Sequence, residues 1–307
     1  MLIEMYQEKV GSNPGGKAKV TIFGRELDVY LKYVYGSKLL RQIPFVPHNQ
    51  PIYEALTLLL ARQFGLKVPD FFVLDNHEKH IQFSYGPNIR KSNRNLDSNH
   101  PYYFISIIFQ ETPDIGILEQ LVQKEKMYRD FLMIGDIEGR KQNYGLYQVP
   151  GNGQTVVYID LGCSFVDAHE GFIKQRTGIT KLIRDQKGFI HEHSKNEFRG
   201  VRKYLENLYI ISNHHNPSQQ QIISLIELID SIPEQKIPLI STSPKIKLQE
   251  NRLGYLLSPE EINEIQNLLL MSFASVLKQY GHHPEKAALI IKQEKKTKLN
   301  IFKTFNY

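Results

Sequence analysis

The sequence predicts an α+β fold with two lobes, a β-rich N-terminal lobe over residues 1–112 and a helical C-terminal lobe over residues 113–307. Two patterns predict this division. Short runs of β-branched and aromatic residues, separated by turn residues, dominate the first part of the chain. From Ile117 onward, apolar residues recur at helical spacing instead. The chain has 307 residues and is 41% hydrophobic, which is enough to bury the core of one or two domains.

The N-terminal lobe is predicted to contain strand pairs and one helix. The predicted pairs are 19–23 with 29–34, and 66–74 with 80–85, and a further strand covers 102–110. Asn49 can cap the helix, which carries Pro51 in its first turn and runs to Phe64. We therefore expect a small sheet with a helix packed on it.

The C-terminal lobe is predicted to hold amphipathic helices and one irregular stretch. Ser258 and Glu261 form a capping box that predicts the start of a helix. The stretch 233–251, which contains Pro238 and Pro244, is predicted to be irregular. Because ligand sites often lie where two lobes meet, we expect a site at their junction.

A dense group of polar residues follows an apolar helical pattern in the C-terminal lobe. Its members are Asp136, Glu138, Arg140 and Asn143. Core packing does not require polar residues at this density. Asp160 ends an apolar strand pattern, and a predicted hairpin over 144–159 separates it from Asn143. Amide and carboxylate oxygens suit Mg²⁺, so Asn143 and Asp160 are candidate metal ligands. A turn role for Asp160 is the alternative.

A glycine- and lysine-containing stretch, residues 11–19, precedes the first strand pattern. Glycines allow backbone amides to approach a phosphate closely, and a lysine adds positive charge. Gly15, Gly16 and Lys17 are therefore candidate phosphate-binding residues. The spacing of a Walker A motif is absent, and an ordinary surface turn is the alternative interpretation.

Lys32 lies in an apolar strand pattern, where a lysine is unexpected if both faces of the strand are covered. A buried ammonium group needs a partner. Glu54, in the helix predicted to follow, is the natural candidate. The alternative places Lys32 on the exposed face of a half-buried strand.

Composition argues against several classes of protein. No apolar run reaches the length of a membrane span, and the N-terminus lacks the pattern of a signal peptide. A single cysteine, Cys163, excludes an intramolecular disulfide. The histidine pairs lack the spacing of a zinc site, so we interpret them as exposed.

The net charge is +6, and basic residues near the C-terminal end include Lys292, Lys295, Lys296 and Lys298. They form either a solvated surface or a patch for nucleic acid, anionic lipid or an acidic partner.

Taken together, these motifs resemble the HipA-like kinases, an atypical branch related in fold to protein and lipid kinases. Residues 58–70 resemble the helix and GL-x-VP segment of that family, and 134–143 resemble its catalytic loop. Asp160 matches its metal-binding strand end, Lys32 its strand lysine and Glu54 its helix acid. The resemblance covers residues 11–170 and is loosest at the phosphate loop.

The resemblance implies a bilobal protein-kinase-like fold that transfers the γ-phosphoryl group of ATP, with Mg²⁺, to a Ser or Thr hydroxyl of a protein. It implies ATP contacts for the glycine stretch and Lys32, which Glu54 would orient, and Mg²⁺ contacts for Asn143 and Asp160. Glu138 falls where the family has an Asp that orients the acceptor, and Arg140 where it has His. Asp136 is the alternative acid. A pseudokinase, or a kinase of a small molecule or lipid, is the rival interpretation.

The resemblance is to the compact, single-domain members of the family, because the phosphate loop starts almost at Met1. We expect a cytoplasmic bacterial protein with a protein substrate, or alternatively a secreted bacterial effector. Stable nucleic-acid binding is not expected, since no basic-aromatic signature of an RNA-binding sheet is present. Contact with a membrane surface through the basic C-terminus is a further expectation.

Overall fold

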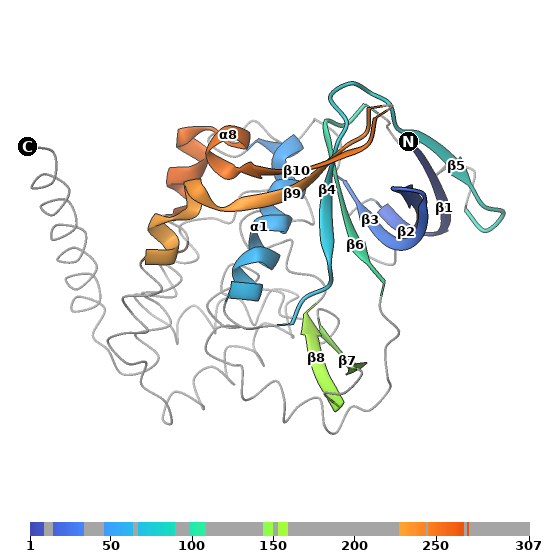
Figure 1. The fold of residues 1–307 in the computed structure, drawn as a ribbon, viewed down its shortest axis with the longest axis horizontal. Helices are drawn as coiled ribbons and strands as arrows, with labels where there is room; N and C mark the ends of the chain where they lie inside the picture. Colours follow the sequence, from blue (N-terminus) through green and yellow to red (C-terminus); the bar gives the residue numbers. More distant parts are fainter. Residues whose placement is uncertain are drawn as a thin grey trace, which may run out of the picture.

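The computed structural model describes residues 1–8, 15–33, 46–63, 67–89, 99–108, 144–149, 153–158, 227–243, 245–266 and 269. An eight-stranded mixed sheet dominates this part of the chain (Figure 1), with the strand order β10-β9-β4-β6-β3-β2-β1-β5. Its strands are β1 (Leu2–Glu8), β2 (Gly15–Ile22), β3 (Arg25–Lys32), β4 (Phe71–Asp75), β5 (Gln82–Tyr85), β6 (Tyr102–Ile107), β9 (Lys236–Ser241) and β10 (Lys247–Arg252). The pairs β1–β5 and β4–β9 are parallel, and the other pairs are antiparallel.

Alternation along the strands creates one apolar face of the sheet. In β2, for example, Ala18, Val20 and Ile22 are buried while the residues between them are partly or fully exposed, as expected when successive side chains point to opposite faces. Equivalent positions of the other strands join them in one core. This core includes Ile3, Met5, Val29, Leu31, Leu74, Tyr103, Ile105 and Ile240.

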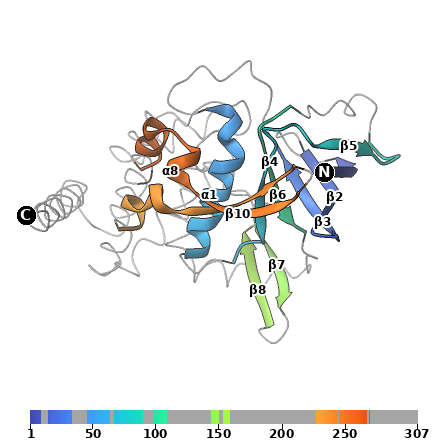
Figure 2. The ribbon, with the colours of Figure 1, turned by 45° about the horizontal axis from the view of Figure 1, so that its top comes forward.

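The helix α1 (Gln50–Gln63) packs on strands β4, β6 and β9 and is preceded by the short 3₁₀ helix η1 (Pro47–Asn49). Figures 1 and 2 show α1 between the sheet and helical segments from the C-terminal part of the chain. These segments are helical at 227–230, at α8 (Leu253–Leu256) and at 259–266. Because α1 is covered on both sides, it is buried nearly all round, including the polar Glu54 and Thr57.

Several predicted elements are confirmed. The strand pair β2–β3, helix α1 and strand β6 lie where the sequence predicts them. The predicted hairpin is present as β7 (Tyr144–Val149) and β8 (Gly153–Tyr158), an antiparallel pair. The capping box is also present. The Ser258 backbone N–H donates to Glu261 Oε2 at 2.8 Å, and the Glu261 N–H donates to Ser258 Oγ at 3.2 Å.

The prediction of an irregular stretch over 233–251 is wrong. Strands β9 and β10 occupy most of it and join the eight-stranded sheet, although they fall in the part of the chain that is predicted to be helical. Proline has no backbone N–H to donate, and Pro238 is tolerated because the pairing of β9 with β4 begins one residue later, at Leu239. On the other edge of β9, Pro238 lies opposite Glu250 of β10.

The predicted pairing of 66–74 with 80–85 is also wrong. Strand β5 pairs with β1, because β6 and β9 already occupy both edges of β4. Asn76 stabilises the turn that follows β4. Its side-chain oxygen accepts hydrogen bonds from the Ile81 N–H and the Thr242 hydroxyl, each at 3.1 Å.

The β-rich character of the N-terminal part is confirmed, whereas the helical lobe and the two-lobed arrangement stay predictions. The described part of the chain leaves out residues 109–143, 159–226 and 270–307. Cys163, the histidine pairs and the basic C-terminal residues fall within these ranges. Among the described helices, none is both long and apolar enough to cross a membrane.

Candidate functional site

Lys32 ends strand β3 on the face of the sheet that α1 covers. Its neighbour Leu31 lies in the apolar core of the opposite face, so alternation directs Lys32 toward α1. Phe104 of β6 is its register partner, and the Lys32 ammonium lies 5.7 Å from the centre of the Phe104 ring. Lys32 is 6% exposed.

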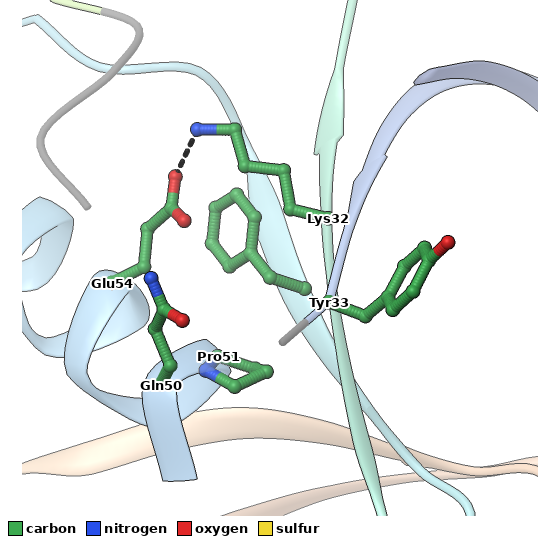
Figure 3. A pocket seen from close by; sticks show the side chains of 6 residues that line it. Lys32, Tyr33, Gln50, Pro51 and Glu54 are labelled. Atoms are coloured by element: carbon green, nitrogen blue, oxygen red, sulfur yellow. Dashed lines mark hydrogen bonds and ion pairs between the residues drawn. The ribbon is translucent and has the colours of Figure 1, made fainter. Parts of the chain in front are cut away.

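Glu54 of α1 supplies a carboxylate for this buried ammonium. Lys32 Nζ donates to Glu54 Oε1, and Glu54 is 3% exposed (Figure 3). The predicted ion pair is therefore present, and the alternative that Lys32 faces solvent is wrong. In an apolar site the two charges offset each other's desolvation only while both are present.

A small pocket adjoins the ion pair. It is lined by Lys32, Tyr33, Gln50, Pro51, Glu54 and Phe104. Figure 3 shows the Lys32 and Glu54 head groups meeting, while the Tyr33 ring points away from them. The pocket volume is about 10 Å³, which is room for about one water molecule. Among the described residues, this pocket therefore leaves room for a single small group beside the ion pair.

The candidate phosphate-binding residues lie within a strand and not ahead of the first one. Strand β1 comes first, and Gly15, Gly16 and Lys17 open β2. Gly15 has a φ of +143°, and a Cβ there would lie 2.0 Å from the backbone oxygen of Leu31. A Cβ on Gly16 would lie 2.3 Å from the backbone oxygen of Gln7. Close contact between strands thus explains both glycines.

The register of β2 nevertheless brings this stretch to the ion pair. Gly15 is paired with Lys32, so the chain enters β2 beside the end of β3. The Lys17 ammonium lies 5.7 Å from the centre of the Tyr30 ring. Phosphate binding by Gly15, Gly16 and Lys17 stays a prediction, and residues 9–14 lie outside the described part of the chain.

The structure does not describe the other predicted site residues. Asp136, Glu138, Arg140, Asn143 and Asp160 lie outside its ranges. It does describe the hairpin between the two candidate metal ligands, in which Tyr144 is paired with Tyr158. Within the described ranges, no group of three His, Cys, Asp or Glu side chains is placed to hold a metal.

A second buried carboxylate, Glu261, contacts the first turn of α1. Glu261 Oε1 accepts hydrogen bonds from the Tyr53 hydroxyl and, at 2.8 Å, from Asn49 Nδ2. Its other oxygen belongs to the capping box with Ser258. Glu261 is 2% exposed and Tyr53 is 1% exposed. Sequence reasoning found the capping box but missed these contacts, because their partners lie 208 and 212 residues away along the chain.

Burial raises the pKa of Tyr53 well above its ordinary value of 10.0, and the neighbouring Glu261 carboxylate adds to this increase. Burial likewise raises the pKa of Tyr102, to about 12, with a further contribution from the negative charge of Asp75. In both cases the folded state keeps a proton that an unfolded tyrosine releases.

These shifts predict a loss of stability at alkaline pH. Above about pH 10 the unfolded tyrosines ionise while the folded ones do not, so the free energy of unfolding falls by about 1.4 kcal/mol per pH unit for one such group. Urea unfolding between about pH 9 and pH 11 measures this slope. Tyr53→Phe should make the slope shallower, by nearly that amount at the upper end of this pH range. An equal slope in both proteins would contradict a raised pKa for Tyr53.

Comparison with known proteins gives distant structural likeness to solved structures. No family model matches the sequence. No curated protein matches it either. Among solved structures, the chain is similar to the crystal structure of a Helicobacter pylori proinflammatory kinase, CtkA, with 9% sequence identity and a TM-score of 0.39. The match covers 92% of this chain and 94% of that chain. A functional assignment therefore has to rest on the residues of this chain.

Proposed function

We propose that this chain is a HipA-like kinase that binds ATP with Mg²⁺ and transfers the γ-phosphoryl group to a Ser or Thr hydroxyl of a protein. The observation that carries the proposal is the buried ion pair between Lys32 of β3 and Glu54 of α1. In protein kinases a strand lysine pairs with a helix glutamate and contacts the nucleotide phosphates.

Packing alone does not require an ion pair in this place. Apolar residues of similar size are often as stabilising as a buried ion pair, or more so. The surroundings of the pair include the Phe104 ring and Pro51, which supply no compensating charge. A fixed ammonium beside a pocket is suited to binding an anionic group, and phosphate is such a group.

The order of the strands supports a nucleotide site beside Lys32. In kinases a glycine-rich loop covers the phosphates, and the lysine lies on a neighbouring strand. Here residues 9–14 connect β1 to β2, and β2 pairs with β3 in a register that places Gly15 opposite Lys32. We propose that Gly15, Gly16 and Lys17 contact the phosphates, while Glu54 orients Lys32.

We propose that Asn143 and Asp160 hold Mg²⁺, which neutralises charge on the phosphates when bound. Asn143 directly precedes β7, and Asp160 follows the end of β8 by two residues. Glu138 is proposed to orient the acceptor hydroxyl, with Asp136 as the alternative acid and Arg140 beside them.

A pseudokinase is the second candidate, and Glu138 is the observation that favours it. Its side chain is one methylene longer than the Asp of the family pattern. A misplacement of about 1 Å near the reacting atoms can cost about 10²-fold in rate. In this case the chain would bind nucleotide and regulate a partner without transferring phosphate.

The test compares transfer of labelled phosphate from ATP by the wild-type chain, Asp160→Asn, Glu138→Ala and Lys32→Met, with protein, lipid and small-molecule acceptors. Loss of the Lys32 ammonium, of a metal ligand or of the acid that orients the acceptor should each lower transfer by about 10²-fold or more. Lys19→Met is the matched control, because Lys19 of β2 forms an exposed pair with Glu26 of β3. It should retain the wild-type rate.

The outcomes separate the candidates. Absence of transfer, with an increase of the melting temperature on addition of ATP, would favour the pseudokinase. Transfer to a lipid or a small molecule alone would correct the acceptor class. Transfer at the wild-type rate by Lys32→Met would contradict the role of the ion pair. A wild-type chain that shows no ATP binding and no phosphate transfer would overturn the proposal.

A further inference from the structure

The hydrogen bonds of Glu261 fix the start of helix α1. Its carboxylate binds Asn49, directly before α1, and Tyr53, in the first turn. The Tyr53 hydroxyl also accepts a hydrogen bond from the Val46 backbone N–H at 3.1 Å. One buried carboxylate thus connects the helical segment 259–266 to α1 and to the chain that enters it.

The geometry of a helix couples Tyr53 to the ion pair. Glu54 follows Tyr53 directly, and successive residues of an α-helix are about 100° apart around the axis. A rotation of α1 that moves the Tyr53 hydroxyl therefore moves the Glu54 carboxylate by a similar amount. For a group about 6 Å from the axis, a rotation of about 20° is a shift of about 2 Å, which is enough to break a hydrogen bond.

Polar contacts add directional restraints on such a rotation to the restraint that packing provides. Most of α1 is apolar and buried on all sides, and apolar contacts have no preferred direction. The directional contacts from outside its own sequence neighbourhood include those of Glu261 at its start and one between Gln63 and Gln235 at its end. Of these two ends, the start is the one that carries Glu54.

We propose that Glu261 is a positioning residue for the nucleotide site. Through Tyr53 and Asn49 it sets the rotation of α1 at which the Glu54 carboxylate meets Lys32. Segment 259–266 is thereby a control element, because any displacement of Glu261 is transmitted to the ion pair. This inference rests on the proposed function where nucleotide affinity is concerned, whereas the coupling of Glu261 to the ion pair does not.

The test compares Tyr53→Phe with Thr57→Val. Each variant removes one buried hydroxyl from α1 and keeps the shape of the side chain, and the Thr57 hydroxyl bonds within α1, to the backbone oxygen of Tyr53 at 3.0 Å. We expect similar losses of melting temperature. ATP affinity should fall about tenfold in Tyr53→Phe and stay near wild type in Thr57→Val. Equal affinities in the two variants would overturn the proposal.

A double-mutant cycle with Glu54→Gln distinguishes positioning from a general structural effect. If Tyr53 acts through Glu54, Tyr53→Phe should cause no further loss of ATP affinity in the Glu54→Gln protein. Additive losses would show that Tyr53 supports the fold without positioning Glu54, and would overturn the proposal.

A readout without nucleotide separates this inference from the proposed function. The rate at which acetic anhydride modifies Lys32, followed by peptide mass spectrometry, reports how firmly the ion pair holds the amine. The rate should be several-fold higher in Tyr53→Phe and in Glu261→Gln than in Thr57→Val. If the wild-type chain binds no ATP, the proposed function fails. The acetylation rates still test whether Glu261 positions the ion pair. Equal rates in the three variants would overturn its positioning role.

Discussion

Glu54→Ala is expected to lower the free energy of unfolding by about 3–5 kcal/mol. The variant removes the carboxylate that the buried Lys32 ammonium binds, and loss of one partner of a buried ion pair is strongly destabilising. Urea unfolding near neutral pH measures the loss. Glu26→Ala is the matched control, because its partner Lys19 is exposed and an exposed ion pair contributes little.

The double variant Lys32→Met, Glu54→Leu separates the cost of removing one partner from the net contribution of the ion pair. It replaces both charges with apolar side chains of similar size, so its stability should equal or exceed that of the wild type. ATP binding should nevertheless be weakened, because the Lys32 ammonium that is proposed to contact the phosphates is gone. A double variant as unstable as Glu54→Ala would show that the ion pair itself holds the fold together.

Gly15→Ala is expected to lower the free energy of unfolding by about 3 kcal/mol or more, or to prevent folding. A Cβ at Gly15 would lie 2.0 Å from the backbone oxygen of Leu31, and the φ of +143° is unfavourable for any residue with a side chain. Relief requires β2 and β3 to move apart, and overpacking of this kind costs about 1–3 kcal/mol in addition to the backbone strain. Thermal unfolding measures the effect.

Gly24→Ala is the matched control, since Gly24 lies in the β2–β3 turn with a φ of +75° and open space around its Cβ position. Only the strain of the left-handed backbone conformation remains there, so Gly24→Ala should lower the free energy of unfolding by about 1 kcal/mol. Gly24→Asn should recover part of that cost, because Asn tolerates this conformation. If Gly15→Ala were no worse than Gly24→Ala, the close approach of β3 to Gly15 would be contradicted.

Local patterns predicted the elements that local chemistry determines. The hairpin of β7 and β8, helix α1 and the Ser258–Glu261 capping box each follow from residues close together in sequence. The ion pair was also predictable, because a lysine in an apolar strand needs a carboxylate and the next helix offers Glu54.

The features that the sequence did not reveal depend on distant partners. Strand β9 contains Pro238, and its place beside β4 becomes apparent only in the assembled sheet. The same holds for β5, whose short pattern does not indicate that β1 is its partner. Glu261 has the sequence context of an ordinary capping residue, and only the fold brings it to Tyr53. In physical terms, periodicity shows which face of an element is buried and not which element covers it.

The parallel pairing of β4 with β9 has a consequence for biosynthesis. The contact between Asn76 and Thr242 spans 166 residues, and at about 5–20 residues per second a ribosome needs about 8–30 s to make that length. During this time one edge of β4 lacks its native partner, and an uncovered apolar strand edge favours pairing with other chains. The nascent chain is therefore expected to depend on a chaperone until β9 has been synthesised.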